Sequence, residues 1–126
     1  MRSYDVMHFT KHENDFVKLL VDIGTRRNVA HVLVFLTNAP EATSRDIERG
    51  TDLRQPEVSM AMQYLTRQKW ISNRESKAEG KGRPVKIYRL AKPISEVMDV
   101  IEREKRQKAK KQLNLIKKLQ NFIRKE

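Results

Sequence analysis

The sequence contains no cysteine. This absence excludes disulfide scaffolds, Cys-ligated zinc and cysteine nucleophiles, and it is compatible with a reducing cytoplasm. The sequence also has no run of 18 apolar residues, so we expect no membrane-spanning segment. The first five residues lack a long apolar stretch, so no secretory signal is visible. Together these absences predict a cytoplasmic protein.

The motifs of several enzyme classes are missing as well. Gly80-Lys81-Gly82 lacks the spacing to a following Lys-Ser/Thr that a phosphate-binding P-loop needs. No Gly-x-Ser-x-Gly motif occurs, and the acidic residues are scattered without a pair suited to acid/base catalysis. His8 and His12 could share a metal on a helix, but two ligands without a third make a weak site. We therefore expect a protein that is not an enzyme and needs no cofactor or metal.

Positive charge is in excess, and it is unevenly placed. Over 126 residues, 27 Lys+Arg and 16 Asp+Glu give a net charge of +11. Residues 67–92 hold nine Lys/Arg against two Asp/Glu, residues 103–126 hold ten against two, and residues 1–66 are nearly neutral. Like charges in such a block repel one another unless solvent screens them or a polyanion binds them. The phosphate backbone of a nucleic acid is a common polyanionic partner. A solvated lysine-rich helix is the alternative for residues 103–126.

Hydrophobic periodicity predicts two helices near the start of the chain. The first covers residues 15–24 and ends at Gly24, and its apolar stripe consists of Phe16, Leu19, Leu20 and Ile23. The second covers residues 28–38, with Asn28 as its N-cap, and Pro40 ends it. This segment is apolar on nearly every side, so a buried strand is the alternative to a central buried helix. His31 within it is expected to be a core histidine.

The next residues predict a helix-turn-helix followed by a β-hairpin. Thr43 and Asp46 form a capping-box pattern that opens a short helix ending at Gly50. A further helix begins near Gln55-Pro56. Residues 70–76 and 85–90 predict two strands joined by a loop that contains Gly and Pro. The core side chains expected from these elements include Val58, Met62, Leu65, Tyr88 and Leu90.

This order of elements is that of a winged helix-turn-helix, a mainly α fold with a small β-hairpin (α+β). A helix fits the major groove of DNA, where each base pair shows a distinct pattern of donors and acceptors. A basic hairpin reaches phosphates or the minor groove. The residues at the start of the helix that begins near Gln55-Pro56 are expected to contact base edges. Arg54 can bind guanine, Gln55 can pair with adenine, and Met60 can pack on a thymine methyl group. The expected DNA-binding residues are Ser44, Arg54, Gln55, Glu57, Ser59, Met60, Gln63, Arg67, Lys77, Lys81, Arg83 and Lys86.

Two stretches resemble the DNA-binding core of the MarR/ArsR/TrmB-like transcriptional regulators of bacteria and archaea, namely Thr43-Ser44-Arg45-Asp46-Ile47-Glu48 and Leu53-Arg54-Gln55-Pro56-Glu57-Val58-Ser59. Residues 80–90 are similar to the wing of these regulators. The resemblance covers residues 28–92, and the whole chain resembles small archaeal regulators, among them the euryarchaeal archaellum regulators. It implies that the helix holding Ser59 enters the major groove and that Arg83 enters the minor groove. Met60 departs from the pattern, since many relatives carry a basic residue there.

The last part of the chain predicts one helix from Pro93 to about residue 124, roughly 45–50 Å long at about 1.5 Å per residue. Its apolar arc is interrupted by polar residues from 104 to 112 and resumes towards the C-terminus. The simplest partner for this terminal arc is the same helix of a second copy, and the rival is folding back onto residues 1–25. The expected dimerisation residues are Leu115, Ile116, Leu119, Phe122 and Ile123.

We therefore predict a winged helix-turn-helix DNA-binding domain over residues 1–92 and a dimerisation helix over residues 93–126. The predicted function is regulation of transcription by a homodimer that binds a specific sequence of double-stranded promoter DNA. Basal transcription factors are further partners to consider, and the resemblance implies archaellum genes as targets. The alternatives are a basic architectural or RNA-associated protein, or a winged helix that docks on proteins of the transcription machinery.

Overall fold

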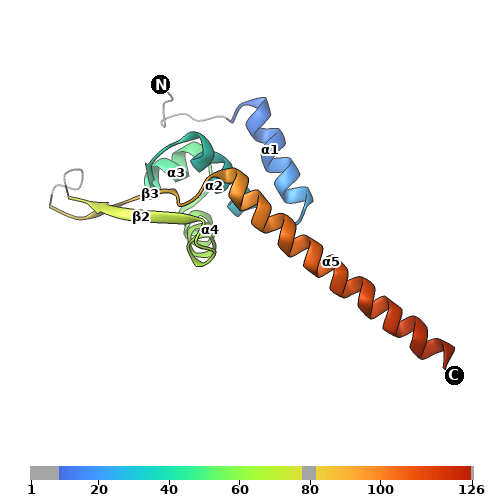
Figure 1. Cartoon of the computed structure of the whole chain (residues 1–126). Coiled ribbons are helices and arrows are strands. Elements are labelled where there is room, and N and C mark those ends of the chain that lie inside the picture. The colour runs from blue at the N-terminus through green and yellow to red at the C-terminus, as the bar shows by residue number, and fades with distance from the viewer. Residues whose placement is uncertain (1–8, 78–81, 126) are drawn as a thin grey trace. The chain divides into compact units, whose positions relative to one another are not determined.

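The computed structural model describes residues 9–77 and 82–125, which form two compact units divided between Lys92 and Pro93. The first unit contains α1 (Lys11–Asp22), α2 (Arg27–Asn38), β1 (Ala42–Thr43), α3 (Ser44–Thr51), α4 (Gln55–Arg67), β2 (Ile71–Ser76) and β3 (Val85–Leu90) (Figure 1). The second unit consists of α5 (Ile94–Arg124). The expected winged helix-turn-helix with a long C-terminal helix is confirmed. No helix in the described part is both long and apolar enough to cross a membrane.

Helix α2 lies at the centre of the first unit, and it packs against α1, α3 and α4. Its buried residues are Val29, Ala30, Val32, Leu33, Val34, Phe35 and Leu36. A helix that is apolar all round must be covered on every side, so the expectation of a buried helix rather than a strand is confirmed. The predicted cap is wrong, because Arg26 occupies the N-cap position and Asn28 lies within the first turn of the helix.

Helix α1 begins four residues before the predicted start, because Thr10 and Glu13 form a capping box there. The predicted apolar stripe is only partly the buried face. Glu13, Val17 and Leu20 are the buried residues of α1, whereas Leu19 and Ile23 are 65% and 44% exposed. The sequence carries apolar residues on two sides of this helix, so its periodicity does not show which side meets α2.

Helix α3 opens with the predicted capping box, in which the Thr43 N–H donates to Asp46 and the Asp46 N–H donates to the Thr43 hydroxyl. The helix does not stop at Gly50, because it continues to Thr51 and the left-handed residue that ends it is Asp52, with φ 56°. Gly50 is buried inside α3, and a Cβ at this position would overlap the ring of Phe35. Glycine therefore permits the close approach of α3 to α2.

The sheet has three strands in the order β1-β3-β2, all antiparallel to their neighbours. The hairpin of β2 and β3 was predicted, whereas the two-residue strand β1 is too short to leave a periodic signal. Ile87 is buried, while Tyr88 and Leu90 are only half-buried. The expectation that Tyr88 and Leu90 lie in the core is therefore wrong, because the alternation of side chains along β3 turns Ile87 to the opposite face.

We predict that Gly50→Ala lowers the stability of the first unit. The new methyl group must displace the Phe35 ring, and overpacking of this kind costs about 1–3 kcal/mol, although alanine is the better helix former. Urea unfolding measures the change. In the Phe35→Leu background the same substitution should cost markedly less, because the smaller side chain leaves room. An equal cost in both backgrounds contradicts this explanation.

Candidate nucleic-acid interface

The turn between α3 and α4 sets the first turn of α4. Leu53 is buried and anchors this turn, and Pro56 occupies the start of the helix, where its missing N–H is not needed. The Arg54 N–H donates a 3.2 Å hydrogen bond to a carboxylate oxygen of Glu57. Glu57 therefore caps α4 with its side chain, while Arg54 and Gln55 are exposed at the tip of the helix.

Asn28 connects α2 to this same turn. Its side-chain N–H₂ donates a 3.0 Å hydrogen bond to the backbone carbonyl of Glu57, and its side-chain oxygen accepts from the Val29 N–H at 2.9 Å. The two segments are 29 residues apart in the sequence. This bond holds the start of α4 against the buried helix α2. The sequence suggested a helix cap for Asn28, and the structure gives it a role in placing α4.

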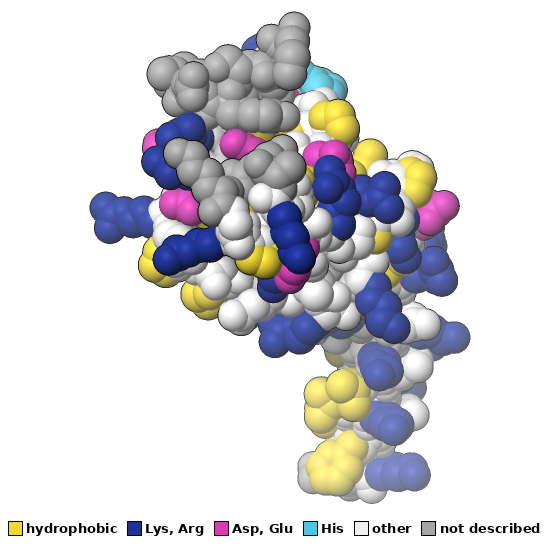
Figure 2. Space-filling view, turned by 90° about the vertical axis from the view of Figure 1, so that its left-hand side faces the viewer, with side chains coloured by type: hydrophobic (Ala, Val, Ile, Leu, Met, Phe, Trp, Pro, Cys, Tyr) yellow, Lys and Arg dark blue, Asp and Glu magenta, His cyan; other side chains and the backbone are white. Residues whose placement is uncertain are grey.

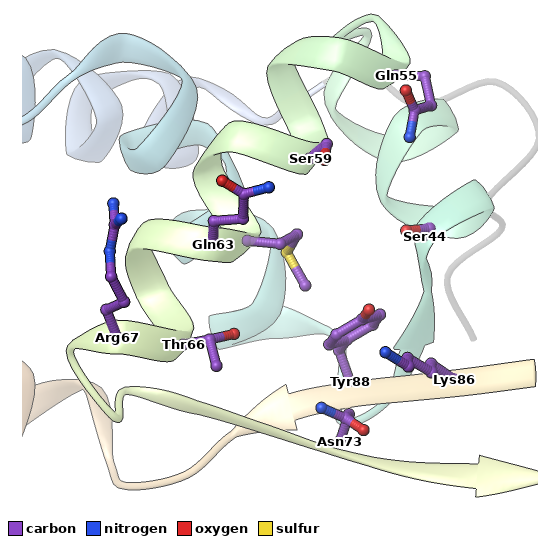
Figure 3. Close-up of a pocket in the computed structure, with 10 residues that line it drawn as sticks. Ser44, Gln55, Ser59, Gln63, Thr66, Arg67, Asn73, Lys86 and Tyr88 are labelled. Carbon is purple, nitrogen blue, oxygen red and sulfur yellow. The ribbon is translucent and has the colours of Figure 1, made fainter.

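An open groove of about 610 Å³ runs between α4 and the hairpin (Figure 3). One wall is α4, from which Ser59 and Gln63 point into the groove, and the other is the hairpin, which contributes Tyr88 and Asn73. Asn73 pairs with Tyr88 across β2 and β3, so both side chains leave the same face of the sheet. The residues that line the groove are Ser44, Gln55, Ser59, Met62, Gln63, Thr66, Arg67, Asn73, Lys86 and Tyr88.

The groove lining contains donors of hydrogen bonds and no carboxylate. Arg67 and Lys86 bring positive charge to its two walls. Hydroxyl and amide groups supply most of the remaining polar atoms, and such groups can donate to phosphate oxygens or to base edges. A concave surface with cations, neutral donors and no acid suits a polyanion.

Six of the expected DNA-binding residues line this groove, and they are Ser44, Gln55, Ser59, Gln63, Arg67 and Lys86. Arg54 and Met60 are exposed but do not line it, and Met60 is 58% exposed. Lys77 and Arg83 are exposed on either side of the hairpin tip, and Lys81 lies outside the described residues. The structure thus gathers about half of the expected residues into one concave surface, with four of them on α4.

Sequence reasoning missed three polar residues of the groove, which are Thr66, Asn73 and Tyr88. Tyr88 was assigned to the core because it is large and aromatic. Lys86 and Tyr88 are two residues apart on one strand and therefore share a face, so the alternation of β3 could have placed them together. No comparable signal marks Asn73, because its position follows only from the pairing of β2 with β3.

An ion pair links the hairpin to the segment before α3. The Arg74 guanidinium donates two hydrogen bonds to the Glu41 carboxylate, at 3.0 and 3.1 Å. These hydrogen bonds hold the pKa of Glu41 below its ordinary value, and Arg89 contributes in the same direction. A lowered carboxyl pKa means that the contribution to stability is present near neutral pH and is lost as the pH falls through that pKa. Both side chains are largely exposed, so the pair orients the hairpin more than it stabilises the fold.

Of the two histidines considered as metal ligands, His8 lies outside the described residues and His12 is exposed on α1. Among the residues that the structure describes, no three His, Cys, Asp or Glu side chains lie close enough to hold a metal ion. The Glu13 carboxylate is buried and accepts from the Thr10 N–H and from the side chain of Asn38. His31 is half-buried, stacks on Phe9 and bonds to the Arg27 carbonyl, so it is less enclosed than expected.

Residues 23–82 match the MarR family. The chain is similar in structure to a possible transcriptional regulator of Methanosarcina mazei Go1, with a TM-score of 0.63 and 16% identity over 92% of this chain and 98% of that chain. Weaker matches are Pex of Synechococcus (TM-score 0.46, 20% identity, 79% and 86% covered) and the Staphylococcus aureus MepR–DNA complex (TM-score 0.49, 23% identity, 89% and 90% covered). No curated protein matches the chain. The family match confirms the resemblance to MarR-like regulators over residues 23–82, and the Methanosarcina structure supports the fold.

We predict that Asn28→Ala lowers the free energy of unfolding by about 1 kcal/mol, the usual net contribution of one hydrogen bond. Asn28→Asp is the matched control, since it keeps the size of the side chain and replaces the donor by an acceptor. This variant should be at least as unstable, because a carboxylate then faces the Glu57 carbonyl. Denaturant titration followed by circular dichroism measures both, and an Asp variant as stable as the parent rules out a structural role for this bond.

Proposed function

Because residues 23–82 match the MarR family, we propose that this protein is a transcriptional regulator that binds a specific sequence of double-stranded DNA as a homodimer. Such a regulator acts in the cytoplasm. The sequence resemblance to archaellum regulators is the reason to propose archaellum genes as its first candidate targets.

The observation that carries this proposal is the acid-free groove between α4 and the hairpin. A helix placed in the major groove and a hairpin placed in the adjoining minor groove must straddle the sugar–phosphate strand that separates the two. The groove is the space that this strand would occupy. Arg67, Lys86 and the hydroxyl groups on its walls then contact phosphates and position α4, whereas they carry little sequence information.

Sequence readout falls to the residues at the exposed tip of α4. Arg54 can bind guanine through O6 and N7, and Gln55 can pair with adenine. Met60 is 58% exposed on the same helix and offers an apolar contact to a thymine methyl group. The capping bond of Glu57 and the bond from Asn28 keep this tip in a fixed geometry, which base readout requires.

The proposed dimer rests on the exposed apolar arc of α5. Leu115, Ile116, Leu119, Phe122 and Ile123 are between 48% and 68% exposed. Their spacing is that of the apolar positions in a supercoiled pair of helices. A contiguous apolar stripe of this kind in a charged helix is typical of an interface, and a second copy is the simplest occupant. Two-fold symmetry would also present two copies of α4 to a pseudo-palindromic site.

We predict that Gln55→Ala and Lys86→Gln have different effects on DNA binding. Gln55→Ala should cost about 1–3 kcal/mol on the cognate site and almost nothing on unrelated sequences, because it removes a base contact. Lys86→Gln should weaken all sequences about equally and reduce the salt slope of log K by about one for each protomer of the dimer, because it removes one phosphate contact from each. Fluorescence anisotropy titrations at several salt concentrations measure both.

Lys18→Gln is the matched control for the second variant, since it removes the same charge from an exposed position on α1. It should leave the salt slope unchanged. If Gln55→Ala weakens cognate and unrelated duplexes alike, the assignment of base readout to this residue is wrong. If Lys18→Gln changes the slope as much as Lys86→Gln, the groove has no special part in binding.

We predict that Leu119→Asp converts the dimer into a monomer, because it places a charge in the middle of the apolar arc. Asn121→Asp adds the same charge on the polar side of α5 and should leave the mass unchanged. Sedimentation equilibrium gives the mass of each variant. A dimeric Leu119→Asp protein would show that the interface lies elsewhere.

A further inference from the structure

Helix α5 carries pairs of cations that repeat every seven residues. The pairs are Lys110-Lys111, Lys117-Lys118 and Arg124-Lys125. All six residues are exposed, and the three pairs follow one uninterrupted helix to its C-terminal end. At about 1.5 Å per residue, successive pairs are separated by roughly 10 Å along the helix axis. The three pairs therefore form a regular ladder of positive charge.

No acidic residue interrupts this ladder. From Lys105 to Lys125 the sequence holds nine Lys/Arg and no Asp or Glu. The ion pair of α5 between Arg106 and Glu102 lies before the first pair of the ladder. Figure 2 shows Lys and Arg side chains along one side of the outer part of α5. Cations at this density repel one another, so a bound polyanion would stabilise this part of the helix.

One row of the ladder lies opposite the apolar arc, whereas Lys111 and Lys118 of the other row lie at the edge of the arc. With about 100° between successive residues, Lys110, Lys117 and Arg124 lie roughly opposite Leu115 and Leu119. Figure 2 likewise shows apolar side chains gathered on the other side of this segment. A partner can therefore cover the apolar arc without covering these cations.

The apolar arc has the same seven-residue spacing, between Leu115 and Phe122 and between Ile116 and Ile123, and this spacing indicates what covers the arc. A stripe that repeats every seven residues drifts around a straight α-helix, and it stays in contact only when two helices supercoil around each other. A flat lipid surface offers no such supercoil. A second helix on the apolar arc leaves the cations facing outwards, where they remain free to bind a separate partner.

We propose that the cation ladder of α5 binds the phosphate backbone of the same DNA duplex as the winged helix-turn-helix. This inference rests on the proposed function and adds a second, sequence-independent contact to it. Duplex DNA carries one negative charge per about 1.7 Å of its axis, so a ladder with steps of about 10 Å meets phosphates along its whole length. Such contacts raise the affinity for every sequence and leave base preference unchanged.

The test is a full-length variant in which Lys110, Lys111, Lys117 and Lys118 are each changed to Gln. Glutamine is polar and uncharged, its side chain is only one atom shorter than that of lysine, and it is a comparably good helix former. The affinity should fall by the same factor for cognate and random duplexes. The slope of log K against log salt should become shallower by about 0.9 for each phosphate that the variant leaves unneutralised, and so by about two to four for each protomer of the bound dimer. The sedimentation mass should stay that of the parent, because the apolar arc is intact.

The matched control removes four charges outside α5, by changing Lys11, Lys18, Arg26 and Arg27 to Gln. All four are exposed in the first unit, and the control should keep the salt slope of the parent. Equal slopes for the ladder variant and the parent overturn the proposal. A second result also overturns it, in favour of a membrane surface. In that result the parent binds phosphatidylglycerol vesicles and the ladder variant does not, while the two bind DNA equally well.

The two proposals fail in different ways. If the parent shows no base preference, the proposed regulator function fails. A shallower slope for the ladder variant on random duplex would even then support the contact made by α5. If base preference is present and the slope of the ladder variant is unchanged, only the inference about α5 fails.

Discussion

The burial of α2 is the constraint on which the rest of the first unit depends. Phe35 meets the backbone of α3 at Gly50, where no side chain larger than hydrogen fits. The same helix packs on α4, and Asn28 at its start bonds to the Glu57 carbonyl in the first turn of α4. Both helices of the helix-turn-helix, α3 and α4, thus pack against the buried helix α2. The proposed contact between the groove and the sugar–phosphate backbone of a duplex needs this kind of fixed support.

The groove itself depends on two further alignments. The antiparallel pairing of β2 with β3 puts Asn73 beside Tyr88, and the bond between Arg74 and Glu41 holds the hairpin to the segment before α3. The side chains that face α4 are then neutral donors and cations. Of the excess positive charge of residues 67–92, the cations Arg67 and Lys86 lie on this concave surface. The excess positive charge of α5 is arranged along a single helix, which suits the proposed contact with the phosphate backbone of DNA alone.

The helices, their order and the hairpin could be predicted from the sequence, because periodicity, the Thr43–Asp46 capping box and Pro56 are local signals. The same local signals placed Gln55, Ser59, Gln63 and Arg67 along α4, and these four residues line the groove. The face of α1 that packs inwards, the two-residue strand β1 and the position of Asn73 were not predictable, since each depends on contacts between segments far apart in the sequence. Tyr88 was misassigned because its size suggested the core, whereas the pleat of β3 turns it to the groove.

The most direct test of a sequence-specific regulator is one comparison of affinities. A duplex selected by this protein from a random pool and a scrambled duplex of the same length and composition are titrated at the same salt concentration. The proposed function predicts that the selected duplex binds about a thousand-fold more tightly or better, the range of specific over non-specific binding. Equal affinity for the two duplexes would contradict it.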